Sequence, residues 1–225
     1  MHKPLGKRVL TTVLMLSAFL TLGACSGGLD EEGQPLTIEQ SEQLAAARFA
    51  LGNGGVFTAT VATGESDSID RIATELTVDP VRLVAWGTLA RGPSDMAVAE
   101  EVYLTETALA VMRDGRWQVQ EQGQLLEQLR IVFALVTDRP ENAQLLRQSD
   151  ARYLGTSDLD DVEMSVFLLP TLDGSDGVSR LWLDPDGSIG RLDSGDDRFV
   201  IRVGGRAPTD EPVDAPIAGA GSDTA

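Results

Sequence analysis

Apolar and polar residues alternate along several segments between residues 57 and 119, and short turn sequences separate these segments. Phe57, Ala59 and Val61 are apolar at every second position, and similar patterns follow at 72–78, 81–90, 98–104, 109–111 and 117–119. A period of two indicates strands with one buried face. Asp79-Pro80 and the pair Asp114-Gly115 predict the turns between strands. We therefore expect an antiparallel meander in this half of the chain.

The second half of the chain contains a further group of strand candidates. They are residues 152–156, 162–169, 178–183, 188–192 and 199–203. Pairs of Asp and Gly separate several of them, as at Asp173-Gly174 and Asp176-Gly177. Such pairs are typical of hairpin turns. This half is therefore expected to add about as many strands as the first half.

Helical patterns precede and separate the two groups of strands. Thr37 with Gln40 predicts a capping box, followed by a helix that ends at Gly52-Asn53-Gly54-Gly55. Residues Gln124–Thr137 form a broadly apolar helical stretch, which predicts a helix that is largely buried or that flanks an apolar space. Pro140 predicts the start of a second short helix, with Leu145 and Leu146 facing inward. Strands at hairpin spacing with helices on one face indicate the α+β class with an antiparallel sheet.

The N-terminus has the features of an export signal over residues 1–24. The basic residues Lys3, Lys7 and Arg8 precede an apolar run from Val9 to Leu22. This run is too short to cross a hydrocarbon core of about 30 Å as a helix. The following Leu22-Gly23-Ala24-Cys25 resembles the lipobox of bacterial lipoproteins, which implies cleavage after Ala24 and a diacylglyceryl group on Cys25. We expect a protein that is lipid-anchored on the extracytoplasmic face of the cell membrane.

Composition divides the remaining chain into three parts. Residues 25–36 are small, polar and acidic, which predicts a lipidated tether. Residues 37–204 are long enough for one domain. Residues 205–225 are rich in Pro, Ala, Gly and Asp, which predicts a disordered tail.

Charge and residue usage exclude several kinds of chemistry. The net charge is −17, and the only histidine and the only lysines, His2, Lys3 and Lys7, lie in the expected signal. The mature chain would lack the imidazole of hydrolase triads, the lysine of Schiff bases and P-loops, and the usual zinc ligands. So acidic a surface disfavours nucleic acid. Carboxylate chemistry, calcium binding or no chemistry remain, and we expect neither an enzyme nor a cofactor.

Acidic residues offer few specific candidates for a site. Asp184-Pro185-Asp186-Gly187 has Gly at the fourth position, where a calcium loop of the EF-hand type needs it at the sixth, so a hairpin turn explains it better. Asp160-Asp161 and Asp196-Asp197 are interpreted as solvated turn residues. Glu100 is in phase with apolar residues of its strand. It lies either inside a cavity or at a strand end near water.

Short segments of the sequence resemble the LppX/LprAFG family of actinobacterial lipoproteins. They are Leu76-Thr77-Val78-Asp79-Pro80, Gly87-Thr88-Leu89, Arg113-Asp114-Gly115-Arg116-Trp117 and Leu181-Trp182-Leu183-Asp184-Pro185-Asp186-Gly187, together with the lipobox. The resemblance implies a strongly curved antiparallel half-barrel, similar to LolA and LolB, with helices packed on the concave face. It implies binding of a lipid, lipoglycan or triacylated molecule between sheet and helices. It carries over no catalytic residues.

The leading hypothesis is therefore a lipid-binding or lipid-transfer lipoprotein with an apolar cavity. The residues expected to line it are Phe57, Val61, Leu76, Val84, Trp86, Leu104, Val111, Leu129, Phe133, Val136, Val166 and Trp182. The alternative is an adaptor or sensor lipoprotein, with a filled core and an envelope protein as partner. The tryptophans fit either reading, because they can line a ligand site or belong to an ordinary core.

Overall fold

The computed structural model describes residues 29–65, 68–93, 97–170, 178–194 and 199–209. The expected signal sequence, Cys25 and most of the C-terminal tail lie outside these residues. Among the helices described, none is long and apolar enough to cross a membrane.

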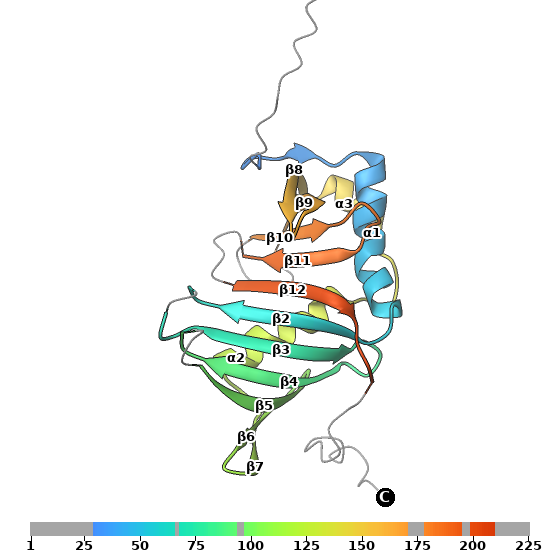
Figure 1. Cartoon of the computed structure of the whole chain (residues 1–225). Coiled ribbons are helices and arrows are strands. Elements are labelled where there is room, and N and C mark those ends of the chain that lie inside the picture. Colours follow the sequence, from blue (N-terminus) through green and yellow to red (C-terminus); the bar gives the residue numbers. More distant parts are fainter. Residues whose placement is uncertain (1–28, 66–67, 94–96, 171–177, 195–198, 210–225) are drawn as a thin grey trace, which may run out of the picture.

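Twelve strands form one antiparallel sheet, shown in Figure 1. The strands are β1 (Gln34–Pro35), β2 (Phe57–Thr63), β3 (Ile72–Asp79), β4 (Val84–Arg91), β5 (Val98–Thr105), β6 (Leu109–Arg113), β7 (Arg116–Gln120), β8 (Arg152–Leu159), β9 (Val162–Pro170), β10 (Val178–Leu183), β11 (Ile189–Asp193) and β12 (Phe199–Arg206). Their order is β1-β8-β9-β10-β11-β12-β2-β3-β4-β5-β6-β7, so β12 joins the two halves of the sheet by pairing with both β11 and β2.

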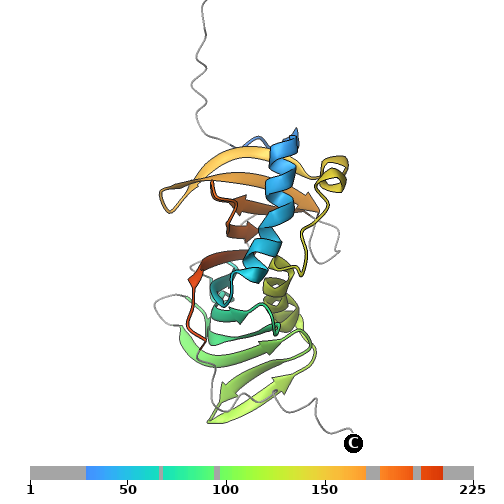
Figure 2. The ribbon, with the colours of Figure 1, turned by 90° about the vertical axis from the view of Figure 1, so that its right-hand side faces the viewer.

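Helices cover one face of this curved, open sheet. The helix α1 (Ile38–Asn53) lies beside the strands of the second half, and α2 (Gln124–Arg130) lies beside those of the first half, as Figures 1 and 2 show. The 3₁₀ helix η1 (Ile131–Leu135) continues α2, and α3 (Ala143–Gln148) packs beside α1. The predicted α+β half-barrel with helices on its concave face is confirmed.

The start of α1 is the predicted capping box. The Thr37 hydroxyl accepts a hydrogen bond from the Gln40 backbone, and the Gln40 side chain accepts one from the Thr37 backbone. Two otherwise unpaired N–H groups are thereby satisfied. The helix ends at Asn53, within the predicted glycine-rich stop.

The other helices differ from the prediction in two places. The expected helix over Gln124–Thr137 changes to 3₁₀ geometry at Ile131 and ends at Leu135. The short helix begins at Ala143 rather than Pro140, because the Asn142 side chain accepts hydrogen bonds from the backbone of residues 144 and 145. Leu146 packs against the core as expected, whereas Leu145 is 63% exposed, so the prediction that it faces inward is wrong.

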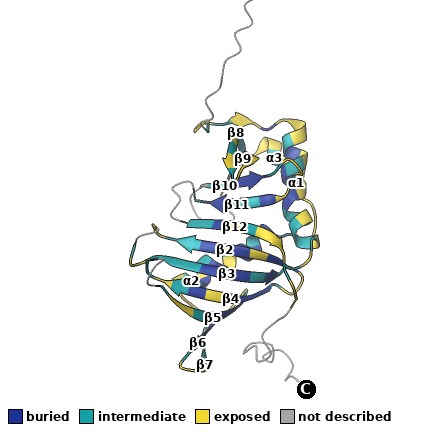
Figure 3. Ribbon diagram, viewed as in Figure 1, coloured by how far each residue is buried: buried dark blue, intermediate teal, exposed yellow. Residues whose placement is uncertain are grey.

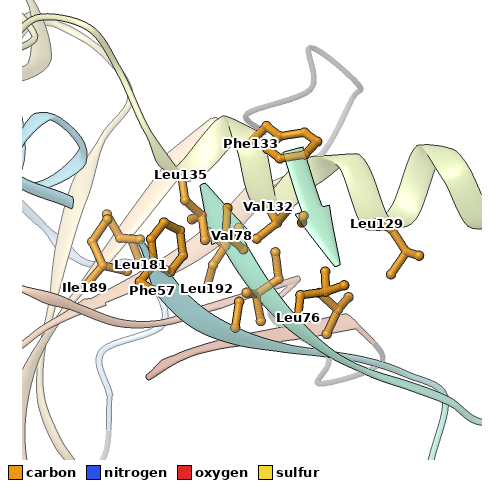
Figure 4. Close-up of a cluster of buried hydrophobic side chains, with 14 of the residues drawn as sticks. Phe57, Leu76, Val78, Leu129, Val132, Phe133, Leu135, Leu181, Ile189 and Leu192 are labelled. Carbon is orange, nitrogen blue, oxygen red and sulfur yellow. The ribbon is translucent and has the colours of Figure 1, made fainter. Parts of the chain in front are cut away.

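Alternation along the strands gives the sheet two faces of different character, visible as alternating colours in Figure 3. The concave face carries the main core, which includes Val61, Leu76, Leu104 and Phe167. Figure 4 shows Val132 and Leu135 pointing from η1 toward residues of the sheet such as Val78 and Leu192. The helices are therefore fixed by burial of apolar side chains against the concave face.

Strands β3 and β4 approach each other unusually closely at Gly87. A Cβ atom at this position would lie 1.8 Å from the backbone oxygen of Glu75. Gly87 is paired with Leu76, in the middle of the β3–β4 ladder. The curvature of the sheet at this point therefore requires a residue without a side chain.

The folded domain extends beyond the predicted boundaries at both ends. The Asp30 amide donates to the Leu154 oxygen at 2.8 Å, and β1 pairs with β8. At the other end β12 continues to Arg206. Gln34 and Pro35, expected in the tether, and Gly205 and Arg206, expected in the tail, thus belong to strands of the sheet.

Candidate functional site

The concave face beneath α2 is filled by side chains from several of the predicted cavity residues. Val61, Leu76, Leu104, Val111 and Leu129 are each at most 2% exposed and belong to one core cluster. The structure brings these residues together as predicted. It packs them against one another, so the hollow expected among them is filled with side chains.

Four of the predicted cavity residues lie on the opposite, convex face. Val84 and Trp86 pack with Tyr103 and Ala110 in a separate cluster. Register explains this, because Ala85 faces the main core and its neighbours on the strand must face away. Their assignment to the cavity is therefore corrected.

The same correction applies to Val166 and Trp182. These two residues are paired across β9 and β10 and form a third cluster with Leu154 and Met164. Their strand neighbours Phe167 and Leu181 face the main core instead. Trp182 has a structural partner on this face, since its Nε1 donates to Asp193 Oδ2 at 2.8 Å.

Asp193 is the centre of a buried ionic network on the convex face. Its side chain is fully buried and accepts from Arg180 Nε at 2.6 Å and from Arg191 Nε at 2.8 Å. The Arg191 guanidinium also lies 5.0 Å from the centre of the Trp182 ring. With so many partners, the network satisfies a buried charge and holds β10 and β11 together.

A groove opens at the end of the half-barrel where η1, the C-terminus of α1 and the β3–β4 turn meet. We call it the rim groove. It has a volume of about 640 Å³ and is lined by Gly52, Asn53, Pro80, Val81, Leu83, Glu106, Phe133, Val136, Thr137 and Asp138. Two predicted cavity residues, Phe133 and Val136, line it. The rim groove is therefore an open space that lies beside the predicted cavity residues of the concave face.

Smaller pockets adjoin the same rim. One of about 280 Å³ shares Glu106 and Phe133 with the rim groove and continues along η1. Another of about 330 Å³ is lined by Phe57, Leu51 and the end of β12. Phe133 separates the first of these from the rim groove, and in Figure 4 it lies on the other side of the helical segment from Val132. These pockets lie near the groove, and both are lined by charged as well as apolar residues.

Residues 123–137, which we call the cover segment, connect the rim groove with the concave core. Gly123 begins the segment with a φ of 131°, which is readily adopted only by glycine. No side chain caps α2, and η1 follows with the weaker hydrogen-bond geometry of a 3₁₀ helix. The segment is held mainly by the burial of Leu126, Leu129, Val132 and Leu135.

A row of four paired residues, two apolar and two polar, crosses the concave face from β2 to β5. Register places Val61, Thr74, Leu89 and Glu100 opposite one another on β2 to β5. Thr74 is fully buried, and its hydroxyl has no hydrogen-bond partner in the described part of the chain. The sequence shows that Thr74 shares a strand face with Leu76 and Val78, but it does not show that the hydroxyl lacks a hydrogen-bond partner.

Glu100 lies at the end of this row, where it forms ion pairs. Arg113 Nε donates to one carboxylate oxygen at 2.6 Å, and Arg91 Nε lies 3.6 Å from the other. The hydrogen bond from Arg113 is the largest cause that lowers the pKa of Glu100. The side chain is 20% exposed, so the alternative of a strand end near water describes it better than an enclosed cavity.

The acidic turns have structural roles. Asp184 closes the β10–β11 hairpin, because its carboxylate accepts from the Ser188 backbone at 2.8 Å. Asp160 and Asp161 adopt positive φ in the β8–β9 turn, and Asp160 pairs with Arg202. Asp196-Asp197 lie outside the described residues. Within the described ranges, no group of three His, Cys, Asp or Glu side chains could hold a metal ion.

Comparison with known proteins finds similarity only at the level of solved structures. No protein-family model matches the chain, and no curated protein matches it either. The chain is similar to LprF from Mycobacterium bovis, with 17% identity and a TM-score of 0.48, over 81% of this chain and all of that one. It is similar to the lipoprotein LppX from Mycobacterium tuberculosis, with 15% identity and a TM-score of 0.47, over 77% of this chain and 96% of that one.

A LolA superfamily protein from Nitrosomonas europaea is more distant, with 11% identity and a TM-score of 0.33, over 79% of this chain and 96% of that one. LppX and LprF belong to the group of lipoproteins that the sequence resembles. At these identities the likeness concerns the fold and says nothing of a ligand.

Proposed function

We propose that the protein is a cell-envelope lipoprotein, anchored through Cys25, that binds the acyl part of a lipid or lipoglycan and carries it. The rim groove is the observation that supports this proposal most directly. Its volume of about 640 Å³ is within the usual range for small-molecule sites, and Phe133 connects it with the apolar core of the concave face. An acyl chain that enters the groove would continue beneath the cover segment.

The energetic balance of such binding is close to even. Displacing Leu126, Leu129, Val132 and Leu135 from the concave face would cost about 6–12 kcal/mol, at about 1.5–3 kcal/mol for each side chain. An acyl chain of about 15 methylenes gains about 12 kcal/mol when it leaves water, at about 0.8 kcal/mol for each methylene. The burial of an acyl chain therefore offsets the displacement of these side chains, and without a ligand the protein stays closed.

Uptake of a fluorescent long-chain fatty acid by the delipidated full chain tests this function. Val136→Asp places a charge in the rim groove and is expected to weaken uptake at least about tenfold, since a charge next to a bound acyl chain is unfavourable. Val98→Asp is the matched control, because Val98 is 73% exposed on β5 and does not line the groove.

Far-ultraviolet circular dichroism and urea unfolding of both variants establish that each is folded. Wild-type protein that takes up no probe, and that carries no lipid in native mass spectrometry after extraction from cells, would rule the function out. Equal uptake by the two variants would remove the rim groove from the proposal.

A second candidate is an adaptor lipoprotein on the same scaffold. The close packing of the concave face favours it, because an adaptor needs a rigid core and no ligand space. Such a protein would take up no lipid and would be recovered with an envelope protein after cross-linking in intact cells. The same uptake experiment therefore separates the two candidates.

A further inference from the structure

The Thr74 hydroxyl is a buried polar group that has no hydrogen-bond partner among the described residues. Its neighbours across the sheet on the concave face are Val61 and Leu89, which are 1% and 0% exposed. Along its own strand the next residue on this face is Leu76. Buried hydroxyl groups nearly always have a hydrogen-bond partner, so an unpaired one in the centre of a core needs an explanation.

A buried water molecule is a poor explanation for this group. Water in a protein interior makes about three hydrogen bonds and therefore needs several polar neighbours. The backbone groups around Thr74 are already used in the ladders to β2 and β4. A ligand that is mostly apolar and has one oxygen atom able to accept a hydrogen bond fits this environment better.

We propose that Thr74 is the specificity-determining contact for an ester oxygen of the bound lipid. The inference rests on the proposed function, because a ligand must displace the cover segment to reach this position. The Thr74 hydroxyl then donates to the ester carbonyl, and the unpaired group gains its partner only in the loaded protein. An ester-linked acyl lipid is thereby favoured over a hydrocarbon of the same length.

The positions of the other sites agree with this orientation of the lipid. Pro80, at the rim groove, directly follows β3 and lies six residues, or about 20 Å, from Thr74, which is comparable with the length of a long acyl chain. Perpendicular to β3, Glu100 lies two strands away from Thr74, or about 10 Å, and its ion pairs to arginine are partly exposed. A polar headgroup at that edge would remain in contact with water.

The test compares two ligands on three variants of the full chain. Methyl oleate carries the ester, and octadecene has a similar chain without it; each displaces a fluorescent fatty-acid probe. We expect wild-type protein to prefer methyl oleate by about 3- to 10-fold, as one neutral hydrogen bond allows. Thr74→Val should lose this preference and keep its affinity for octadecene. Thr74→Ser should restore the preference, and Thr60→Val, on the exposed opposite face of β2, should leave it unchanged.

Urea unfolding of the lipid-free variants provides a second readout that is independent of the ligand. Because valine has the shape of threonine without the unpaired hydroxyl, Thr74→Val should have an unfolding midpoint equal to or above that of wild type. A clearly lower midpoint would mean that the hydroxyl already has a partner, which overturns the inference.

The possible failures are distinguishable. If wild-type protein binds neither ligand, the proposed function fails. If it binds both ligands equally, or if Thr74→Val keeps the preference for the ester, the function stands and the role of Thr74 is refuted.

Discussion

Replacing Gly87 with alanine should be among the most damaging single changes to this fold. The new Cβ would lie 1.8 Å from the Glu75 oxygen, whereas real Cβ contacts are essentially never shorter than 3.0 Å. Strands β3 and β4 would have to separate by more than 1 Å at the centre of the ladder. Because the obstructing atom belongs to the backbone, no side-chain rotation can relieve the overlap.

We expect Gly87→Ala to lower the free energy of unfolding by about 3 kcal/mol or more, at the upper end of overpacking effects. Urea titration followed by tryptophan fluorescence gives the midpoint and slope, and hence the free energy. Gly205→Ala is the control. Gly205 lies on β12 of the same sheet, and a Cβ at this position would meet no atom within 4 Å. If Gly87→Ala stayed within about 0.5 kcal/mol of wild type, the close approach of the strands would not be needed for the fold.

Three further predictions concern charge and attachment. The pKa of Glu100 is lower in the folded protein than in the unfolded chain. Glu100 therefore stabilises the fold at pH values above its pKa in the unfolded chain, and this stabilisation is lost as the pH falls through its pKa in the folded protein. The free energy of unfolding of the wild-type protein should fall from pH 7 toward pH 3. Glu100→Gln should be less stable than wild type by about 1 kcal/mol at pH 7, and its free energy of unfolding should fall less over the same range. Urea titrations at each pH measure both. Asp193→Asn should cost about 3–5 kcal/mol in the same assay, because it breaks a buried ionic network; an unchanged midpoint would contradict this. Cys25→Ala should move the protein from the membrane fraction to the soluble fraction after ultracentrifugation, and a variant that remained in the membrane fraction would refute the lipid anchor.

The strands could be predicted because their signal is local. Alternation along β2 and β3, with Asp79-Pro80 as a turn, is enough to give strand positions to within a few residues. The assignment of faces was less successful on β4, where Val84, Ala85 and Trp86 are all buried. When both faces of a strand are covered, apolar character no longer tells which residues share a cavity.

The cover segment shows a second limit of sequence patterns. Residues 131–135 are apolar at every position, so they carry no periodicity from which a change from α to 3₁₀ geometry could be predicted. The sequence also does not reveal how tightly the core beneath them is packed, because this depends on how side chains from distant strands interlock. For Thr74 the sequence shows a hydroxyl in an apolar register, and only the tertiary structure shows that nothing pairs with it.

The position of β12 has a consequence for biosynthesis. This strand joins the two halves of the sheet, and its residues are made after those of every other described strand. Until they emerge, β2 and β11 both present unpaired edges, which are sites of aggregation in a nascent chain. Pairing over such long separations is also slow. The two halves therefore cannot form one continuous sheet until β12 has paired with both β11 and β2.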